Sequence, residues 1–211
     1  MNRETRRLQI EGPSGVIEAA ADEPAGALRG VAVLCHPHPQ HGGTMDNKVV
    51  QTLARAFVQL GYRAVRFNFR GVGGSAGVWD EGSGEIDDAL AVIASQREDP
   101  NAGGLPLALG GFSFGGYVAA QATARLADSA PVERLVLIGP ATSRFEVPAV
   151  PRDTVVIHGE ADDVVPLAAT LDWARPQVLP VIVLPGVGHF FHGQLTLLKS
   201  QVVQAWHQPN S

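Results

Sequence analysis

Short apolar segments alternate with segments of helical periodicity along most of the chain. The segment Gly30–Cys35 is continuously apolar, which is typical of a strand buried on both faces of a sheet. Between Asn47 and Leu60, apolar side chains recur at intervals of three and four residues, as they do on the buried face of a helix. Gly61 follows at the position where such a helix ends. The first pair of elements is therefore a buried strand followed by an amphipathic helix.

The same alternation repeats to the end of the chain. The further strands that the pattern predicts are 62–69, 105–110, 132–138, 154–157 and 178–184. The further helices are a segment around residues 86–93, then 115–126, 167–174 and 195–206. Two short strands at 7–11 and 16–20, joined by the turn sequence Gly-Pro-Ser-Gly, predict an antiparallel hairpin ahead of all these elements.

Strands that alternate with helices need crossover connections, which place helices against both faces of a sheet. The sequence therefore predicts an α/β fold with a mostly parallel, twisted sheet and an N-terminal antiparallel hairpin. Because 211 residues contain no internal repeat and no long linker, we expect residues 1–211 to form one domain. In such a sheet, ligands bind beyond the carboxyl ends of the strands, so candidate chemistry is sought there.

Composition narrows the choice of function before any motif is considered. The formal net charge of −5 argues against nucleic-acid binding, which normally uses a basic face. The single cysteine, Cys35, rules out an intrachain disulfide and a cysteine-rich zinc site. No apolar run reaches membrane-spanning length, and the first residues lack the apolar segment of a secretory signal. We therefore expect a soluble, cytoplasmic protein with no nucleic-acid or membrane partner, and the composition indicates no oligomeric state.

The strongest chemical signal follows the predicted strand 105–110. There the sequence Gly111-Phe-Ser113-Phe-Gly115 matches G-x-S-x-G at a turn between a buried strand and a helix. Such a turn projects the serine hydroxyl above the sheet, and its glycines let strand and helix approach without a Cβ clash. The helix N-terminus also favours developing negative charge. Ser113 is therefore the candidate nucleophile.

A serine hydroxyl needs a base, and that base needs a third group to orient it. Asp162 lies in the loop after the penultimate predicted strand, and His189 lies in the loop after the last one. The order Ser113, Asp162, His189 is the chain order of triads in α/β-hydrolases. His192, which we expect inside the last helix, is a weaker candidate for the base.

These motifs resemble those of the α/β-hydrolase superfamily. The likeness is closer to a small bacterial, lidless group whose loop after the third strand has the sequence H-P-H-P. Here that loop is His36-Pro37-His38-Pro39, and the resemblance extends over essentially the whole chain to His189. It implies Ser113 as the nucleophile, His189 as the general base and Asp162 as the acid that orients the imidazole.

The resemblance also chooses between two neighbouring carboxylates. Asp163 is a rival for the acid, but the family pattern H-G-x-x-D-x-x-V-P falls on residues 158–166 and places the acid at Asp162. Asp163 then has a structural role, as a cap of the helix near Pro166.

The reaction that the resemblance implies also needs two N–H donors for an oxyanion. The first is implied to be the N–H of Phe114, the residue after the nucleophile. The family usually has His-Gly before the second donor, whereas this chain has His36-Pro37. Because proline has no N–H, we assign the second donor to His38, with His36 as a side chain that organises the loop.

Three other interpretations have some support. His36, His38 and His41 have the H-x-H-x-x-H spacing of metal ligands, but a complete serine triad makes a metal redundant. Residues 71–76 match the loose dinucleotide fingerprint G-x-G-x-x-A, but outside the first strand-to-helix turn, so we expect a structural turn bordering the site. A non-catalytic binding protein is the third, and the complete triad argues against it. We expect neither a cofactor nor a metal.

The sequence therefore predicts a serine hydrolase that cleaves carboxylic esters of small substrates through an acyl-enzyme. Thioester cleavage and amide or peptide cleavage use the same machinery and remain alternatives. Phe114 and Phe190 flank catalytic positions and are candidates for lining the acyl pocket. Only residues 139–153 precede the acid-bearing strand after the strand 132–138, which is too short a segment for a helical lid. We therefore expect a lidless core with a solvent-accessible triad.

Overall fold

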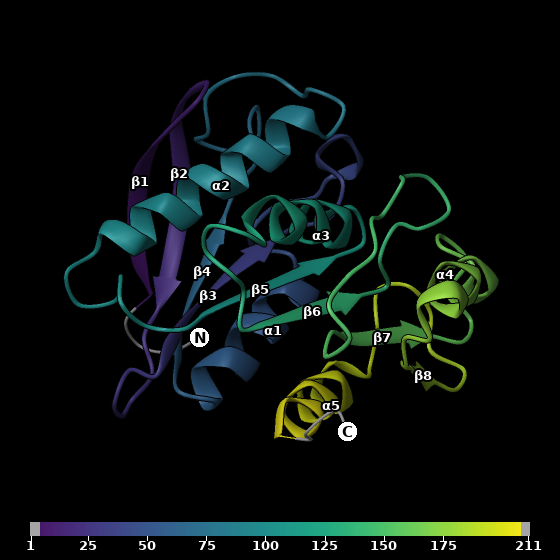
Figure 1. The fold of residues 1–211 in the computed structure, drawn as a ribbon. Helices are drawn as coiled ribbons and strands as arrows, with labels where there is room; N and C mark the ends of the chain where they lie inside the picture. The colour runs from purple at the N-terminus through teal and green to yellow at the C-terminus, as the bar shows by residue number, and fades with distance from the viewer. Residues whose placement is uncertain (1–4, 208–211) are drawn as a thin grey trace.

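A twisted sheet of eight strands forms the centre of the computed structural model, which describes residues 5–207 (Figure 1). The strands are β1 (Arg6–Gly12), β2 (Gly15–Asp22), β3 (Gly30–Cys35), β4 (Tyr62–Phe67), β5 (Leu107–Phe112), β6 (Arg134–Ile138), β7 (Val155–Gly159) and β8 (Val181–Leu184). Their order across the sheet is β1-β2-β4-β3-β5-β6-β7-β8. β1 is antiparallel to β2, and β2 is antiparallel to β4, whereas the pairings from β4 to β8 are all parallel.

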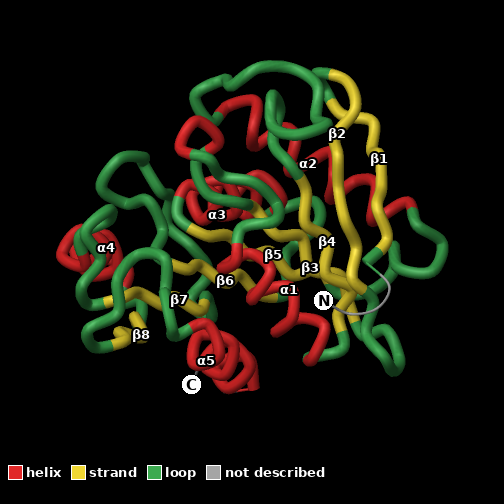
Figure 2. The backbone as a smooth tube through the Cα atoms, turned by 180° about the vertical axis from the view of Figure 1, so that it is seen from behind, coloured by secondary structure: helices red, strands yellow, loops and turns green. Residues whose placement is uncertain are grey.

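Helices cover both faces of this sheet (Figures 1 and 2). The α-helices within residues 5–207 are α1 (Lys48–Gln59), α2 (Ser83–Glu98), α3 (Phe114–Leu126), α4 (Leu167–Ala174) and α5 (Leu195–His207). α1 and α5 pack on one face, and α2 and α3 pack on the other. The predicted α/β fold, with its mostly parallel sheet and N-terminal hairpin, is confirmed. None of the helices in the described part of the chain is long and apolar enough to span a membrane.

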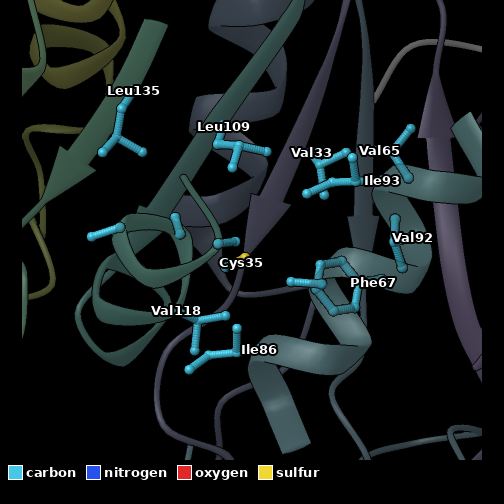
Figure 3. Close-up of a cluster of buried hydrophobic side chains, with 14 of the residues drawn as sticks. Val33, Cys35, Val65, Phe67, Ile86, Val92, Ile93, Leu109, Val118 and Leu135 are labelled. Atoms are coloured by element: carbon cyan, nitrogen blue, oxygen red, sulfur yellow. The ribbon is translucent and has the colours of Figure 1, made fainter. Parts of the chain in front are cut away.

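The core under α2 and α3 is built from alternate positions of the central strands. Val33 on β3, Val65 on β4 and Leu109 on β5 are buried on this face (Figure 3). They pack in the same cluster as Ile93 of α2 and Val118 of α3. The intervening residues of the same strands belong to the second cluster, under α1 and α5. Burial on both faces explains why β3 and β5 are continuously apolar in the sequence rather than alternating, whereas β4 also contains Arg63 and Arg66.

Most strand boundaries differ from the predicted ones by one to three residues, and in β5 and β8 the difference has a clear local cause. β5 begins at Leu107 and continues past the predicted end at Gly110, because Gly110 and Gly111 both pair in register with β3 and β6. Glycine normally weakens a strand interior, which is why the pattern ended the strand too early. β8 starts at Val181 rather than at Val178, because Val178 has a φ of 53° at the end of a short 3₁₀ segment, Arg175–Gln177.

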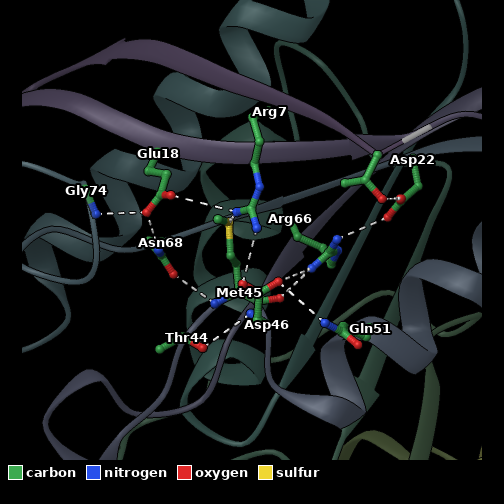
Figure 4. A network of polar contacts seen from close by, with 11 residues as sticks. Arg7, Glu18, Asp22, Thr44, Met45, Asp46, Gln51, Arg66, Asn68 and Gly74 are labelled. Atoms are coloured by element: carbon green, nitrogen blue, oxygen red, sulfur yellow. Dashed lines mark hydrogen bonds and ion pairs between the residues drawn. The ribbon is translucent and has the colours of Figure 1, made fainter. Parts of the chain in front are cut away.

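A polar network ties the hairpin to the loop that follows β4 (Figure 4). The carboxylate of Glu18, on β2, accepts hydrogen bonds from the Asn68 side chain and from the N–H of Gly74, both at 2.8 Å. The Asn68 side chain in turn accepts the N–H of Met45 at 2.8 Å. The segment 71–76, for which the sequence predicts a structural turn, is thus anchored to the edge of the sheet.

A buried ion pair holds the start of this loop. Arg70 donates to the carboxylate of Asp88, on α2, from its backbone N–H and its Nε at 3.0 Å and from a terminal nitrogen at 2.8 Å. The Asp88 side chain is 1% exposed and the Arg70 side chain is 9% exposed. Such a pair fixes geometry strongly, because removal of either charge leaves the other uncompensated in the interior.

Asp88→Asn should therefore lower the free energy of unfolding by about 3 kcal/mol or more. Asp87→Asn, one residue earlier on the same helix, is the matched control, because Asp87 pairs with Arg125 at 2.7 Å in an exposed position. Loss of an exposed pair costs about 0–1 kcal/mol. Urea denaturation followed by circular dichroism measures both changes, and equal losses in the two variants would contradict the role assigned to Asp88.

Candidate active site

The predicted nucleophile occupies a strained turn between β5 and α3. Ser113 has a φ of 56° and a ψ of −118°. Such a conformation costs a non-glycine residue about 1–3 kcal/mol and persists only where the surroundings enforce it. The N–H of Ser113 donates to the carbonyl of Ile138 at 2.9 Å, and its carbonyl accepts the N–H of Ala141 at 3.2 Å. The end of β6 and the turn after it therefore stabilise the sharp change of direction at the serine.

Two glycines of this turn are required by close backbone contacts. A Cβ on Gly111 would lie 2.0 Å from the carbonyl oxygen of Gly115. A Cβ on Gly115 would lie 2.2 Å from the carbonyl oxygen of Cys35. Because glycine alone lacks this atom, any other residue at these positions forces the strands and the helix apart. The first turn of α3 therefore packs directly against the end of β3.

The predicted acid and base are hydrogen-bonded to each other. Nδ1 of His189 lies 2.6 Å from Oδ2 of Asp162. Asp162 follows β7 and His189 follows β8, and these neighbouring strands are parallel, so both loops lie at the same edge of the sheet. A carboxylate oxygen accepts from an imidazole N–H, so Nδ1 carries the hydrogen and Nε2 is left to accept a proton.

Hydrogen bonds hold the Asp162 carboxylate ionised. Its Oδ1 accepts the N–H of Val164 at 2.9 Å and the N–H of Val165 at 2.7 Å. Burial by itself would raise the pKa of Asp162, but the hydrogen bonds from His189 and from these two N–H groups hold that pKa below its ordinary value. The carboxylate is thus ready to orient an imidazole and to stabilise a positive charge on it.

Two predictions about neighbouring residues are wrong. Asp163 does not cap α4, whose N-cap position, Pro166, receives no side-chain hydrogen bond in the described structure. Asp162 itself closes the turn that leads into this helix. His192 lies outside the last helix, because α5 begins only at Leu195. The intervening residues form a turn instead, in which the N–H of Gln194 donates to the carbonyl of Phe191.

Ser113 lies beside the pair of acid and base. The ring of Phe112 packs against the His189 imidazole, with centroids 4.8 Å apart. Gly139, at the end of β6, is next to both groups: a Cβ there would lie 3.5 Å from Oδ2 of Asp162 and from Nδ1 of His189. Within residues 5–207, the Ser113 hydroxyl makes no hydrogen bond. Contacts between a catalytic hydroxyl and its base are often long until a substrate binds.

The three side chains are more covered than expected. Ser113 is 8% exposed, Asp162 is 7% exposed and His189 is 3% exposed, so the prediction of a solvent-accessible triad is wrong. Residues 139–153, between β6 and β7, form no helix, which confirms the predicted absence of a cap. Phe190 is 45% exposed, and its ring centroid lies 5.1 Å from that of His189.

The two predicted oxyanion donors come from adjacent segments. Phe114 is the first residue of α3, and His38 lies in the loop after β3, against which the first turn of α3 packs. The two side-chain rings are 5.2 Å apart between centroids. Neither backbone N–H has an acceptor among the described residues. Unpaired N–H groups at a helix N-terminus are suited to bind an oxygen that gains negative charge.

His36 acts as the loop-organising side chain that the sequence suggests. Its Nδ1 donates to the carbonyl of Pro37 at 2.6 Å, and its Nε2 accepts the N–H of Phe69 at 3.1 Å. Burial lowers the pKa of His36 to about 4, against a smaller opposing effect of the Pro37 carbonyl. Both ring nitrogens are therefore engaged by the backbone. No three His, Cys, Asp or Glu side chains within residues 5–207 are arranged to hold a metal ion.

The motifs assign no role to two residues that the structure places beside the acid. Gly139 is one of them, and no local signal marks it, because its position depends on the pairing of β6 with β7. His158 is the other, a fully buried residue whose Nε2 lies 3.4 Å from Oδ2 of Asp162. The pattern H-G-x-x-D does contain this histidine, four residues before the acid.

Comparisons of the sequence and of the structure with known proteins point to the same family. The family described as serine aminopeptidase, S33, matches residues 27–152. A serine hydrolase without a lid from Xanthomonas campestris is 36% identical, with a TM-score of 0.88 over 100% of this chain and 99% of that one. An α/β serine hydrolase homologue from Coxiella burnetii is 37% identical, with a TM-score of 0.84 over 97% of each chain.

The chain belongs to the α/β serine hydrolases. An uncharacterized protein of Rickettsia prowazekii is also similar to this hydrolase, at 33% identity over 200 residues, 88% of this chain and 82% of that relative. The likeness to the lidless structure extends over the whole fold, so the expected membership of this superfamily is confirmed.

Gly115→Ala should destabilise the hydrolase by about 2–3 kcal/mol, because the new Cβ would be forced against the backbone of β3. The matched control is Gly104→Ala, since no atom lies within 4 Å of a Cβ at that position. We expect the control to change stability by less than about 0.5 kcal/mol. Denaturation curves measure the free energy of unfolding of the two variants. If Gly115→Ala is as stable as Gly104→Ala, the close packing assigned to Gly115 is wrong.

The stability of the hydrolase should depend on pH through His36. Because its pKa falls from 6.5 to about 4 on folding, the unfolded chain binds this proton more readily. The contribution of neutral His36 to the free energy of unfolding is therefore complete above about pH 6.5. It is lost as the pH falls toward 4, and the loss amounts to up to about 3 kcal/mol. Between these limits the free energy of unfolding should rise less steeply with pH in His36→Asn than in the wild type. The exposed His192→Asn serves as control, and equal slopes in all three proteins would contradict the assignment.

Proposed function

We propose that this hydrolase cleaves carboxylic esters of small substrates through an acyl-enzyme. Ser113 is the nucleophile, His189 is the general base and Asp162 orients the imidazole. The observation that carries the proposal is the strained Ser113 turn at the start of α3, beside a hydrogen-bonded pair of imidazole and carboxylate. A serine enforced in this backbone conformation next to such a pair is what nucleophilic acyl transfer requires.

The first half of the reaction transfers the acyl group to the enzyme. Oγ of Ser113 attacks the ester carbonyl carbon while Nε2 of His189 takes the hydroxyl proton. Asp162 accepts the Nδ1–H and stabilises the imidazolium that forms. The N–H groups of Phe114 and His38 stabilise the negative charge on the former carbonyl oxygen. His189 then gives its proton to the leaving oxygen, the carbon–oxygen bond breaks and the alcohol departs.

The second half uses water in place of the serine. Nε2 of His189 takes a proton from a water molecule as the water oxygen attacks the acyl carbon. The tetrahedral intermediate again places its oxyanion at the N–H groups of Phe114 and His38. Collapse breaks the bond to Oγ of Ser113, which recovers its proton from His189, and the carboxylic acid leaves. The protein supplies every group that these steps need.

Cleavage of amide bonds is the second candidate, and the description of the matching family as serine aminopeptidase favours it. Thioester cleavage is a third use of the same groups. The three reactions share the acyl-enzyme and differ in the leaving group, and an amine must be protonated before it departs, whereas a thiol need not be. Relative kcat/KM for a chromogenic ester, a thioester and an aminoacyl anilide of the same acyl group therefore ranks the three candidates.

Ser113→Ala should lower kcat for a short-chain chromogenic ester by about 10⁴- to 10⁶-fold and abolish labelling by a fluorophosphonate probe. Ser143→Ala, at an exposed serine in the loop after β6, is the matched control and should keep both the activity and the labelling. Steady-state kinetics and mass spectrometry of the labelled peptide are the measurements. Hydrolysis that survives Ser113→Ala in folded protein would refute the mechanism.

A further inference from the structure

A second imidazole contacts the acid of the proposed triad. His158 lies on β7, and its side chain is completely buried. Its Nε2 lies 2.9 Å from the carbonyl oxygen of Val165 and 3.4 Å from Oδ2 of Asp162. The same Oδ2 accepts the hydrogen bond from His189. Two imidazoles therefore meet on one carboxylate oxygen, and the steps of acyl transfer use only one of them.

The surroundings of His158 fix the position of its ring hydrogen. A carbonyl oxygen can only accept, so Nε2 carries the hydrogen and donates it to Val165, with Oδ2 of Asp162 3.4 Å from the same nitrogen. Nδ1 is then an acceptor, and it is buried without a donor among residues 5–207. Burial lowers the pKa of His158, in spite of the opposing effects of the Val165 carbonyl and the Asp162 charge. The ring is therefore a neutral donor with a defined tautomer.

His158 lies beside a carboxylate that is already held on both oxygens. Oδ1 of Asp162 accepts the N–H groups of Val164 and Val165, and Oδ2 accepts the N–H of His189, with Nε2 of His158 3.4 Å away. A carboxylate with donors on both oxygens cannot rotate without breaking a hydrogen bond. His158 binds the carbonyl of Val165 and so holds the end of the turn 162–165 that supplies one of these donors.

We propose that His158 is a positioning residue for the acid of the triad. Its Nε2–H binds the carbonyl of Val165 and so holds the turn 162–165 in the conformation in which Oδ2 of Asp162 accepts the Nδ1–H of His189. The inference rests on the proposed function and adds a residue that neither touches the substrate nor exchanges a proton. Three further ionisable side chains lie on the loops of the acid and the base, and all are exposed: Glu160, Asp163 and His192.

The test compares two substitutions at this position. His158→Leu removes the N–H and leaves the volume largely filled, whereas His158→Gln offers an amide N–H near the place of Nε2. We expect His158→Leu to lower kcat about tenfold at unchanged KM, since it removes the buried hydrogen bond to the Val165 carbonyl that holds the turn of the acid. His158→Gln should recover most of this loss. Asp163→Asn, at the exposed neighbour of the acid, should keep the wild-type kcat.

A second measurement does not depend on activity. In the Ser113→Ala protein, ¹⁵N NMR should show a neutral His158 ring with its hydrogen on Nε2 throughout the pH range in which the protein is folded. The proton shared by His189 and Asp162 should give a strongly downfield signal. Addition of His158→Leu to this protein should shift or broaden that signal, because the carboxylate is freer to rotate.

The outcomes separate this inference from the proposed function. Wild-type kcat in a folded His158→Leu variant, or a His158→Gln variant no better than the leucine variant, overturns the positioning role. If His158→Leu does not fold, the spectrum of the Ser113→Ala protein decides, because a hydrogen on Nδ1 also overturns it. Failure of the proposed function is visible elsewhere, as hydrolysis that survives Ser113→Ala.

Discussion

The close contact between the first turn of α3 and the end of β3 is the constraint on which the rest of the site depends. It exists only because position 115 is glycine: a Cβ there would lie 2.2 Å from the carbonyl oxygen of Cys35. The contact brings the N–H of Phe114 beside the loop that carries His38. It also forces Ser113, between the strand and the helix, into its strained backbone conformation. The strain of about 1–3 kcal/mol is offset by hydrogen bonds from the end of β6. One packing contact thus places the N–H of Phe114 beside the His38 loop and imposes the sharp turn at the serine.

Around this contact the protein buries three imidazoles and gives each a different role. His36 uses both ring nitrogens to join the loops after β3 and β4. His158 uses one nitrogen as a donor and buries the other without a partner among the described residues. His189 is held by Asp162 through Nδ1, which leaves Nε2 for chemistry. In each case the oxygen atom that the ring faces determines which ring nitrogen carries the hydrogen. The position of this hydrogen then determines whether the other nitrogen can take part in the proposed reaction.

Much of this arrangement could be predicted from the sequence, because the signals concerned are local. Apolar runs and helical stripes predict the order of strands and helices, and G-x-S-x-G at a strand-to-helix turn predicts the serine. The pairing of Asp162 with His189 follows from chain order and from the rule that sites lie beyond the carboxyl ends of parallel strands. What escaped prediction depends on contacts between distant segments. The low exposure of Ser113, Asp162 and His189 and the position of Gly139 depend on the pairing of β6, β7 and β8, which no local pattern encodes. His158 does lie within the local pattern H-G-x-x-D, but the pattern does not say which way its ring points.

The arrangement of the strands also sets the order in which function and fold are lost. His189, the proposed base, lies in the loop after β8, the strand at one edge of the described sheet, where it pairs with β7. β8 has four residues, of which only Leu184 is buried, whereas the inner strands that carry the serine and the oxyanion loop are buried throughout. Segments with few buried contacts open at a lower free energy than the core. Opening of this edge would displace His189 while the turn at Ser113 stays folded, so under the proposed function inactivation would precede global unfolding.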